Sequence, residues 1–250
     1  MQYWLVLITA VLALSWPPQA QCKPLTEIKA AVADIPGWKD AISALLREIS
    51  EEIKVPIRVE VVPFKRAVAM LIDRTVDIAA PHLRPDRVPL ATLPVDFSQA
   101  TFSYVDFVLY SRKGEPGVTP DAIRTMSKDK LRIGTGPSAL TFFSFPYQTY
   151  FNVAGGLDGL VDRHIDGFIW AKDVMDPILK QRHLEGKIQR TLFQRYANYF
   201  LLPKGTSGSD IDRLLSKGVS ALKAKNRLGE LFKAVEYEAT DSIFHRRGLR

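Results

Sequence analysis

The chain has little of what small disulfide-stapled proteins and structural metal sites need. Cys22 is the single cysteine among 250 residues, so no internal disulfide can form and the fold relies on a hydrophobic core. The four histidines are far apart and show no ligand spacing with Cys22, which excludes a structural zinc site. We therefore expect neither a metal nor a cofactor.

Runs of one charge, internal repeats and low-complexity tracts are also missing. Lys and Arg number 34 against 27 Asp and Glu, a net charge of +7, but these basic residues are scattered. The longest basic run is His245-Arg246-Arg247, and the chain lacks a platform of interleaved aromatic and basic residues. We therefore expect no nucleic-acid partner, whereas a basic surface favours small anionic ligands or an anionic membrane surface.

Only one long apolar run occurs, and it lies at the start of the chain. Tyr3 to Trp16 holds no charged residue but is shorter than the roughly 20 residues that span a bilayer. The segment Pro17-Pro18-Gln19-Ala20 follows, although no Lys or Arg precedes the run. This pattern predicts a signal peptide at residues 1–21 and an exported protein. The residues before Cys22 do not match a lipoprotein motif, so we expect no lipid anchor there.

The remaining sequence, with 46% hydrophobic and 24% charged residues in the whole chain, is typical of a globular protein large enough for one domain or two lobes. Its hydrophobic spacing predicts alternating strands and helices, an arrangement that favours a parallel sheet covered on both faces. The predicted strands are residues 28–33, 57–62, 76–80, 101–110, 131–134, 165–170 and 199–202. The predicted helices are residues 41–53, 64–73, 119–126, a helix after Ser138, 156–163, 173–183 and 211–235, the last broken at Gly218 and Gly229.

Several segments, in chain order, resemble the extracellular solute-binding proteins of family 3, the polar-amino-acid type that serves ABC importers. They are Val62-Pro63-Phe64-Lys65-Arg66-Ala67 through Asp77, Ala79-Ala80-Pro81-His82-Leu83-Arg84-Pro85-Asp86-Arg87, Val95-Asp96-Phe97-Ser98, Leu157 to Phe168, and Tyr199-Phe200-Leu201-Leu202-Pro203-Lys204-Gly205. One departure is Arg74-Thr75, which stands where the family usually has Gly-Glu.

This resemblance implies an α/β protein with a two-lobe, type II periplasmic-binding-protein-like fold. Two crossover hinge strands would join the lobes near residues 106–111 and 196–202, with a ligand cleft between the lobes. Lobe 1 would comprise residues 22–109 plus 198–250, and lobe 2 residues 110–197. Such lobes close over a ligand by hinge motion.

The implied function is that of a monomeric periplasmic binding protein, not an enzyme. It would capture a small carboxylate-bearing ligand, an amino acid or a related organic acid, for the permease of an ABC importer. Two alternatives stay open: a dehydratase-like periplasmic enzyme on the same scaffold, and a ligand-binding partner of a membrane sensor. The enzyme would need a carboxylate acid or base in the cleft, for which Asp34 and Asp173 are the nearby candidates.

Four residues of the first lobe are candidates for ligand contact. Arg87 matches the arginine that grips a carboxylate with two parallel donors; the alternative is a surface pair with Asp86. Arg66 would be either a second cationic contact to the ligand or an exposed arginine of a helix. His82 stands where the family has Thr or Ser, and would titrate near neutral pH, or it is a local hydrogen-bonding residue. Trp38 matches loosely an aromatic that stacks on ligand, with packing within the lobe as the alternative.

In the second lobe, Gly136 and Ser138 lie at a strand-to-helix junction where backbone amides could bind an anion, although Pro137 removes one amide. Trp170 would shape an apolar or aromatic subsite. Ala171 stands where the amino-acid binders have an aspartate for the ligand ammonium. Either the ligand lacks this amine, or Asp34 or Asp173 supplies the carboxylate; Asp173 could equally cap the following helix.

Overall fold

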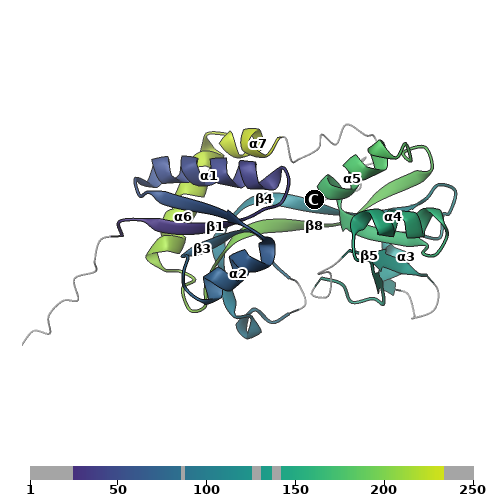
Figure 1. Ribbon diagram of the computed structural model, residues 1–250, viewed down its shortest axis with the longest axis horizontal. Coiled ribbons are helices and arrows are strands. Elements are labelled where there is room, and N and C mark those ends of the chain that lie inside the picture. Colours follow the sequence, from purple (N-terminus) through teal and green to yellow (C-terminus); the bar gives the residue numbers. More distant parts are fainter. Residues whose placement is uncertain (1–24, 86–87, 126–130, 137–141, 234–250) are drawn as a thin grey trace, which may run out of the picture.

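The computed structural model describes residues 25–85, 88–125, 131–136 and 142–233 (Figure 1). The predicted signal peptide lies outside these residues. Within them, no helix has both the length and the apolar composition needed to cross a membrane.

One mixed sheet of eight strands, in the order β2-β1-β3-β8-β4-β7-β5-β6, runs through the molecule (Figure 1). Its parallel pairs are β1 with β2 and β3, and β5 with β6 and β7. The central strands β4 and β8 are antiparallel to each other and to their neighbours β7 and β3, so the parallel pairing favoured by the sequence holds in the two outer parts of the sheet but not at its middle. The strands are β1 Ile28–Ala33, β2 Ile57–Val62, β3 Ile78–Leu83, β4 Val95–Arg112, β5 Ile133–Thr135, β6 Gln148–Thr149, β7 Gly167–Ala171 and β8 Ile188–Pro203.

Helices cover both faces of each half of the sheet. In the first half, α1, α6 and α7 pack on one face and α2 on the other; in the second half, α4 and α5 pack on one face and α3 lies on the other (Figure 1). The helices are α1 Trp38–Ile53, α2 Phe64–Ile72, α3 Pro120–Thr125, α4 Val153–Val161, α5 Lys172–Gln181, α6 Asp210–Ala224 and α7 Arg227–Phe232, with a short 3-10 turn at Leu90–Thr92. The structure is thus an α/β fold of two lobes.

The two long strands differ most from the sequence prediction. β4 starts at Val95 rather than at residue 101, and β8 starts at Ile188 rather than at residue 199. These strands pair along almost their whole length, from Val95 opposite Pro203 to Arg112 opposite Ile188. Residues 188–198 therefore form a strand because they pair with β4, although their mixed polar sequence does not predict one.

Two predicted helices need correction. The C-terminal helix is not broken at Gly218 or Gly229; it is interrupted at Asn226, which has a φ of 56° between α6 and α7. Of the helix predicted after Ser138, residues 137–141 lie outside the described part, and residues 142–147 are not helical.

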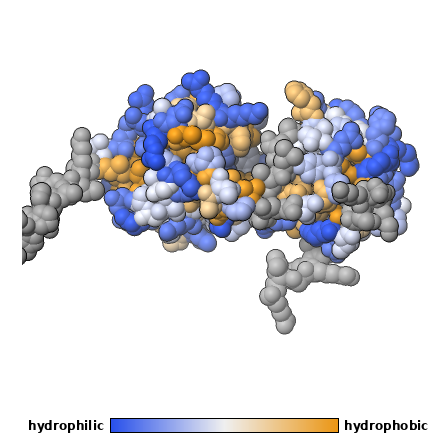
Figure 2. All heavy atoms as spheres, turned by 90° about the horizontal axis from the view of Figure 1, so that it is seen from below, coloured by the Kyte–Doolittle hydropathy of each residue, from blue (hydrophilic) through white to orange (hydrophobic). Residues whose placement is uncertain are grey.

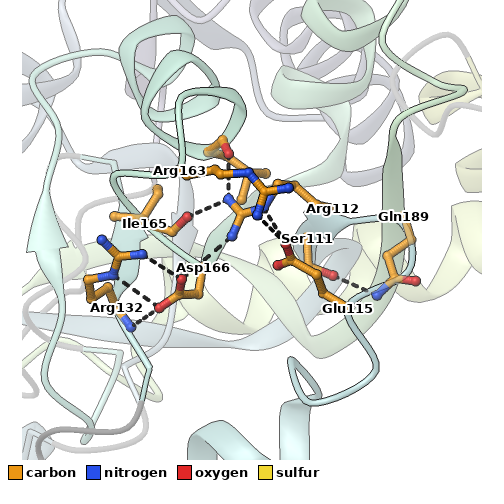
Figure 3. A network of polar contacts seen from close by, with 9 residues as sticks. Ser111, Arg112, Glu115, Arg132, Arg163, Ile165, Asp166 and Gln189 are labelled. Carbon is orange, nitrogen blue, oxygen red and sulfur yellow. Dashed lines mark hydrogen bonds and ion pairs between the residues drawn. The ribbon is translucent and has the colours of Figure 1, made fainter.

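A polar network fastens the outer end of lobe 2 (Figure 3). Arg112, at the end of β4, donates from Nη1 to the carbonyls of Leu160 and Ile165 at 2.6 and 2.7 Å, and from Nε to Glu115 at 2.7 Å. Asp166 lies 3.5 Å from Nη2 of the same arginine. Because only 12% of the Arg112 side chain is exposed, this guanidinium anchors β4, α4 and the loop before β7 together.

Two of the resembling segments, residues 95–98 and 199–205, are joined by hydrogen bonds in lobe 1. The Asp96 carboxylate accepts the amides of Gly205, Thr206 and Ser207 at 2.8, 3.1 and 3.3 Å. Burial raises the pKa of Asp96, but these amides and the Lys204 ammonium outweigh it and hold the pKa below its ordinary value. The Val95-Asp96-Phe97-Ser98 motif therefore fixes the turn that follows β8.

Candidate functional site

The carboxyl ends of the parallel strands in the two lobes face each other across the middle of the molecule (Figure 1). Asp34 follows β1, Phe64 opens α2 directly after β2, and His82 lies near the end of β3. From lobe 2, Gly136 follows β5 and Trp170 lies near the end of β7. Ligands of open α/β sheets bind at this edge, because strand-to-helix loops present side chains and amides there. We call this region the interlobe junction.

A hydrogen bond between side chains crosses the interlobe junction. The indole Nε1 of Trp38, at the start of α1, donates to Oδ2 of Asp173, in the first turn of α5. The two residues are 135 positions apart in sequence, so no local pattern could reveal that they meet. The N-cap of α5 is Ala171, which shows that Asp173 is not the helix cap considered from the sequence.

The Asp173 carboxylate is incompletely satisfied. Its Oδ1 atom is buried and has no hydrogen-bond donor among the described residues. Burial raises the pKa of Asp173, while the Trp38 N–H and the first amides of α5 act in the opposite direction. A buried carboxylate oxygen without a donor costs free energy, so this group gains from any donor or cation that reaches it.

Trp38 is held in place by aromatic packing in lobe 1. Its ring lies 5.8 Å from that of Phe232 at the end of α7, and Phe232 in turn stacks on Phe102 of β4 at 5.8 Å. With 4% of its surface exposed, Trp38 packs within its lobe and also reaches the other lobe through its N–H. The structure thus shows the packing role considered from the sequence, and stacking of Trp38 on a ligand stays a prediction.

His82 is buried against Phe64, with ring centroids 4.6 Å apart, and its Nε2 has no partner among the described residues. Burial lowers the pKa of His82 to about 3. The expectation that it titrates near neutral pH is therefore wrong: His82 is a neutral imidazole at the end of β3.

The two charged candidates of lobe 1 that the structure describes, Asp34 and Arg66, are exposed. Asp34 accepts a hydrogen bond from Nζ of Lys39 at 2.9 Å, so its carboxylate already has a cationic partner. Arg66 lies on the exposed side of α2 and makes no ion pair or side-chain hydrogen bond with other described residues. The structure leaves Arg66 available to an anion but does not orient it.

Trp170 and Gly136 lie together in lobe 2. A Cβ atom on Gly136 would fall 2.8 Å from the Trp170 ring, so only glycine allows the loop after β5 to pack this closely. The ring also makes an edge contact with Phe107 of the crossing strand β4, at 5.8 Å. Nearby, Phe143 and Phe145 are buried and belong to the hydrophobic core.

Two predicted site residues, Arg87 and Ser138, lie outside the described residues, so their roles stay predictions. The sequence did not single out Lys172, which is 9% exposed beside Ala171 at the start of α5. The only signal was its place directly after a strand.

A separate open depression of about 810 Å³ lies at the opposite end of lobe 1. Val76, Leu202, Ile211 and Leu214 contribute to its lining, which combines the amino-terminal side of β3 with α6. Because it lies at the other edge of the strands, it is distinct from the interlobe junction.

Comparison with known proteins identifies the fold. No protein-family model matches the sequence, and the search of curated proteins returned no match. Among solved structures, a putative ABC-transporter binding component from Wolinella succinogenes in complex with lysine aligns with a TM-score of 0.60 at 17% identity, covering 83% of this chain and 94% of that one.

Two further structures show the same likeness. The GluR0 ligand-binding core from Nostoc punctiforme in complex with L-glutamate aligns at a TM-score of 0.59 and 13% identity, over 82% of this chain and 97% of that one. A histidine kinase sensor domain with similarity to periplasmic binding proteins aligns at a TM-score of 0.60 and 12% identity, over 84% of this chain and 96% of that one. The chain thus has the two-lobe fold of the periplasmic binding proteins.

Proposed function

We propose that this chain is a periplasmic solute-binding protein that captures a small ligand at the interlobe junction and delivers it to an ABC importer. The observation that carries the proposal is the meeting of the two carboxyl-terminal sheet edges, bridged by Trp38 and Asp173. Such an arrangement surrounds a ligand from two lobes and excludes water when they approach. The lysine and glutamate complexes of similar structures support a ligand of amino-acid size.

We further propose that the ligand bears a carboxylate. Arg66 lies in the first turn of α2 and is without a partner among the described residues. Arg87, by its place in the resembling segment, supplies the bidentate contact. Residues 22–109 plus 198–250 would form lobe 1 and residues 110–197 lobe 2, with the hinge in β4 and β8, the strands that run through both.

Thermal denaturation of residues 22–250 against amino acids, simple carboxylates, polyamines and quaternary amines tests the proposal, with Arg87→Ala measured in parallel. A ligand at a hundredfold excess over its Kd stabilises the native state by about 2.7 kcal/mol, which raises the melting temperature. We expect a carboxylate-bearing compound to stabilise the wild type and to lose its effect in Arg87→Ala. Stabilisation by a carboxylate-free cation, unchanged in that variant, would remove the role of Arg87.

A sensor role is the second candidate, because a histidine kinase sensor domain shares the fold. In that case the ligand-bound chain would contact a membrane receptor rather than a permease. The discriminating experiment reconstitutes the ligand-bound protein with any ABC importer and any sensor kinase whose genes neighbour its own. Stimulation of ATP hydrolysis supports delivery to an importer, whereas stimulation of a neighbouring kinase supports sensing.

A further inference from the structure

We propose that two copies of this chain associate through strand β2, whose open edges pair with each other in antiparallel orientation about a two-fold axis at Val59. The contact joins lobe 1 of each copy into one continuous sheet and places Arg58 of each copy opposite Glu60 of the partner subunit. The inference concerns the assembly of the protein and does not depend on the proposed function. It departs from the monomer that the resemblance implies.

The first step is the edge that β2 leaves open. In the described part of the chain, β2 ends the sheet, and β1 is the one strand that pairs with it. The carbonyls of Pro56 and Val62, at the two ends of β2, accept amides from β1 and from the residue after it at 2.9 and 2.8 Å. Because the peptide groups of successive strand residues point to opposite sides, the even-numbered residues face β1. The residues that direct their N–H and C=O groups to the open edge are therefore Ile57, Val59 and Val61.

The second step concerns the side chains of this edge. Ile57 and Val59 pack on the hydrophobic core beneath α1, and Val61, on the same face of the strand, has 45% of its surface exposed. Arg58 and Glu60 point to the other face, where both are exposed and neither pairs with another described residue. An added strand covers the exposed valine and gives each charge a partner. The edge thus offers the peptide groups, the apolar contact and the charges that strand addition uses.

The third step fixes the register. The outward-facing residues of two copies meet in three neighbouring antiparallel registers. Two of these set Arg58 against Arg58 of the partner subunit, or Glu60 against Glu60 of the partner subunit, and like charges directly opposite each other destabilise a strand pair. The register about Val59 gives two Arg58–Glu60 pairs instead. It also sets Val59 against Val59 of the partner subunit and Ile57 against Val61 of the partner subunit, and each such pair exchanges two hydrogen bonds.

The charge pattern favours a second copy over an unrelated strand. An edge strand with charges of one sign repels a copy of itself, which protects many proteins from edge-to-edge aggregation. Arg58 and Glu60 have opposite signs and lie symmetrically about Val59, so β2 is complementary to itself under two-fold symmetry. The next outward position is Pro63, which has no N–H, so the ladder ends after Val61. A contact this short predicts a weak, concentration-dependent dimer.

Sedimentation equilibrium of residues 22–250, from about 10 µM to about 1 mM, measures the association. The variants are Arg58→Glu, Glu60→Arg, the double exchange Arg58→Glu/Glu60→Arg, and Lys187→Glu as the matched control. Lys187 is exposed in lobe 2 directly before β8, so its replacement makes the same charge change as Arg58→Glu outside the contact. Circular dichroism verifies that each variant is folded, which the exposure of the replaced side chains favours.

We expect the wild type and Lys187→Glu to dimerise equally. Each single exchange at β2 turns two opposite-charge pairs into like-charge pairs, so the dissociation constant of the dimer should rise about tenfold or more. The double exchange reverses the direction of each pair and should restore the wild-type constant to within about threefold. A mixture of Arg58→Glu and Glu60→Arg should form a heterodimer more readily than either variant associates with itself.

Oxidative cross-linking tests the register, in a Cys22→Ser background. When Arg58→Cys and Glu60→Cys are mixed, the two thiols lie opposite each other and one Arg58–Glu60 pair is retained, so we expect a disulfide-linked dimer. Residues in such a non-hydrogen-bonded pair have Cα atoms about 4.5 Å apart, a separation that suits a disulfide. Each variant alone should cross-link much less, because its cysteine lies opposite a charged residue.

Three outcomes would overturn the inference. A wild type that is monomeric at every concentration excludes the dimer, and single exchanges that leave association unchanged, or a double exchange that does not restore it, exclude pairing through β2. One cysteine variant that cross-links with itself as well as the mixture does excludes the register about Val59. If an exchange variant does not fold, the cross-linking comparison still decides the question. Solute binding by each copy stands in all of these cases.

Discussion

The protonation state of a residue depends on its burial, and His82 illustrates this at the end of β3. The imidazole is 8% exposed, packs on Phe64 and has an Nε2 without a partner in the described chain. No described residue compensates a positive charge on this ring, so burial disfavours the imidazolium in the folded state. The unfolded chain, by contrast, binds a proton at His82 with the ordinary pKa of 6.5.

This difference predicts that acid destabilises the fold through His82. The contribution to stability is complete above pH 6.5 and is lost progressively as the pH falls towards 3, because the unfolded state alone takes up the proton. The loss is at most about 1.4 kcal/mol per pH unit. Urea unfolding between pH 6.5 and 5 should therefore show a shallower pH dependence in His82→Gln, with the exposed His164→Gln as the control. An equal slope in His82→Gln and the wild type would contradict the buried neutral state.

At the scale of elements, two glycines in the C-terminal helices have opposite surroundings. Gly218 lies within α6 where this helix packs on α1, and a Cβ atom there would come within 2.7 Å of the Ile49 side chain. Gly229 lies in α7, and a Cβ atom placed on it would have no neighbouring atom within 4 Å. The first glycine therefore permits close helix packing, whereas the second only weakens its helix.

Substitution by alanine should separate these two roles. Gly229→Ala should stabilise the protein by about 0.5–1 kcal/mol, because alanine loses less backbone entropy in a helix. Gly218→Ala should destabilise it by about 1–3 kcal/mol, because overpacking outweighs the same helical gain. Denaturant unfolding of both variants measures the difference. If both stabilise the protein, α1 and α6 pack less closely than described.

At the scale of the whole molecule, the two lobes share one sheet. β4 and β8 contribute to both halves and pair with each other from end to end. One hydrophobic cluster also contains Ile28 of β1 and Ile133 of β5, which lie in different lobes. Because the strands are common to both cores, unfolding of one lobe disturbs the other, and we expect a single cooperative transition.

Removal of the Arg112 side chain tests this coupling. Arg112→Ala removes the buried guanidinium that joins the Leu160 and Ile165 carbonyls to Glu115 and Asp166. Although Arg163 and Arg132 still contact those two carboxylates, we expect a cost of about 3 kcal/mol. For a chain of this size we expect a fall in melting temperature of about 6–12 °C. Calorimetry should show that the single peak shifts as a whole. A split into two peaks would mean that the lobes unfold independently.

Some large apolar side chains of lobe 1 are exposed at the molecular surface. Figure 2 shows apolar patches on lobe 1 among hydrophilic side chains, in a view from the side of α2. The exposed apolar residues of β2 and α2 are Val61, Phe64 and Ile72. Val61 and Phe64 lie at the carboxyl end of β2 and the start of α2, on the junction side of lobe 1, whereas Ile72 ends α2.

The sequence by itself determined the amphipathic helices and the short parallel strands. Residues 57–62 alternate in hydrophobicity, and Ile42, Leu45 and Ile49 repeat at helical spacing, so local periodicity was enough to place β2 and α1. The resembling segments predicted the two-lobe fold, which the structure confirms. Their short motifs were less informative about function, since Asp96 holds a turn rather than a ligand.

Only the tertiary structure decided how the distant segments meet. Residues 188–198 became strand because β4 pairs with them, and the local sequence carries no comparable signal. Asp173 gained its buried, half-satisfied carboxylate because Trp38 reaches it from the other lobe. His82 lost its charge because the fold removes it from water. Strand pairing, loss of contact with water and contact between the lobes all depend on residues that are distant in the sequence. The local sequence around a residue therefore does not specify them.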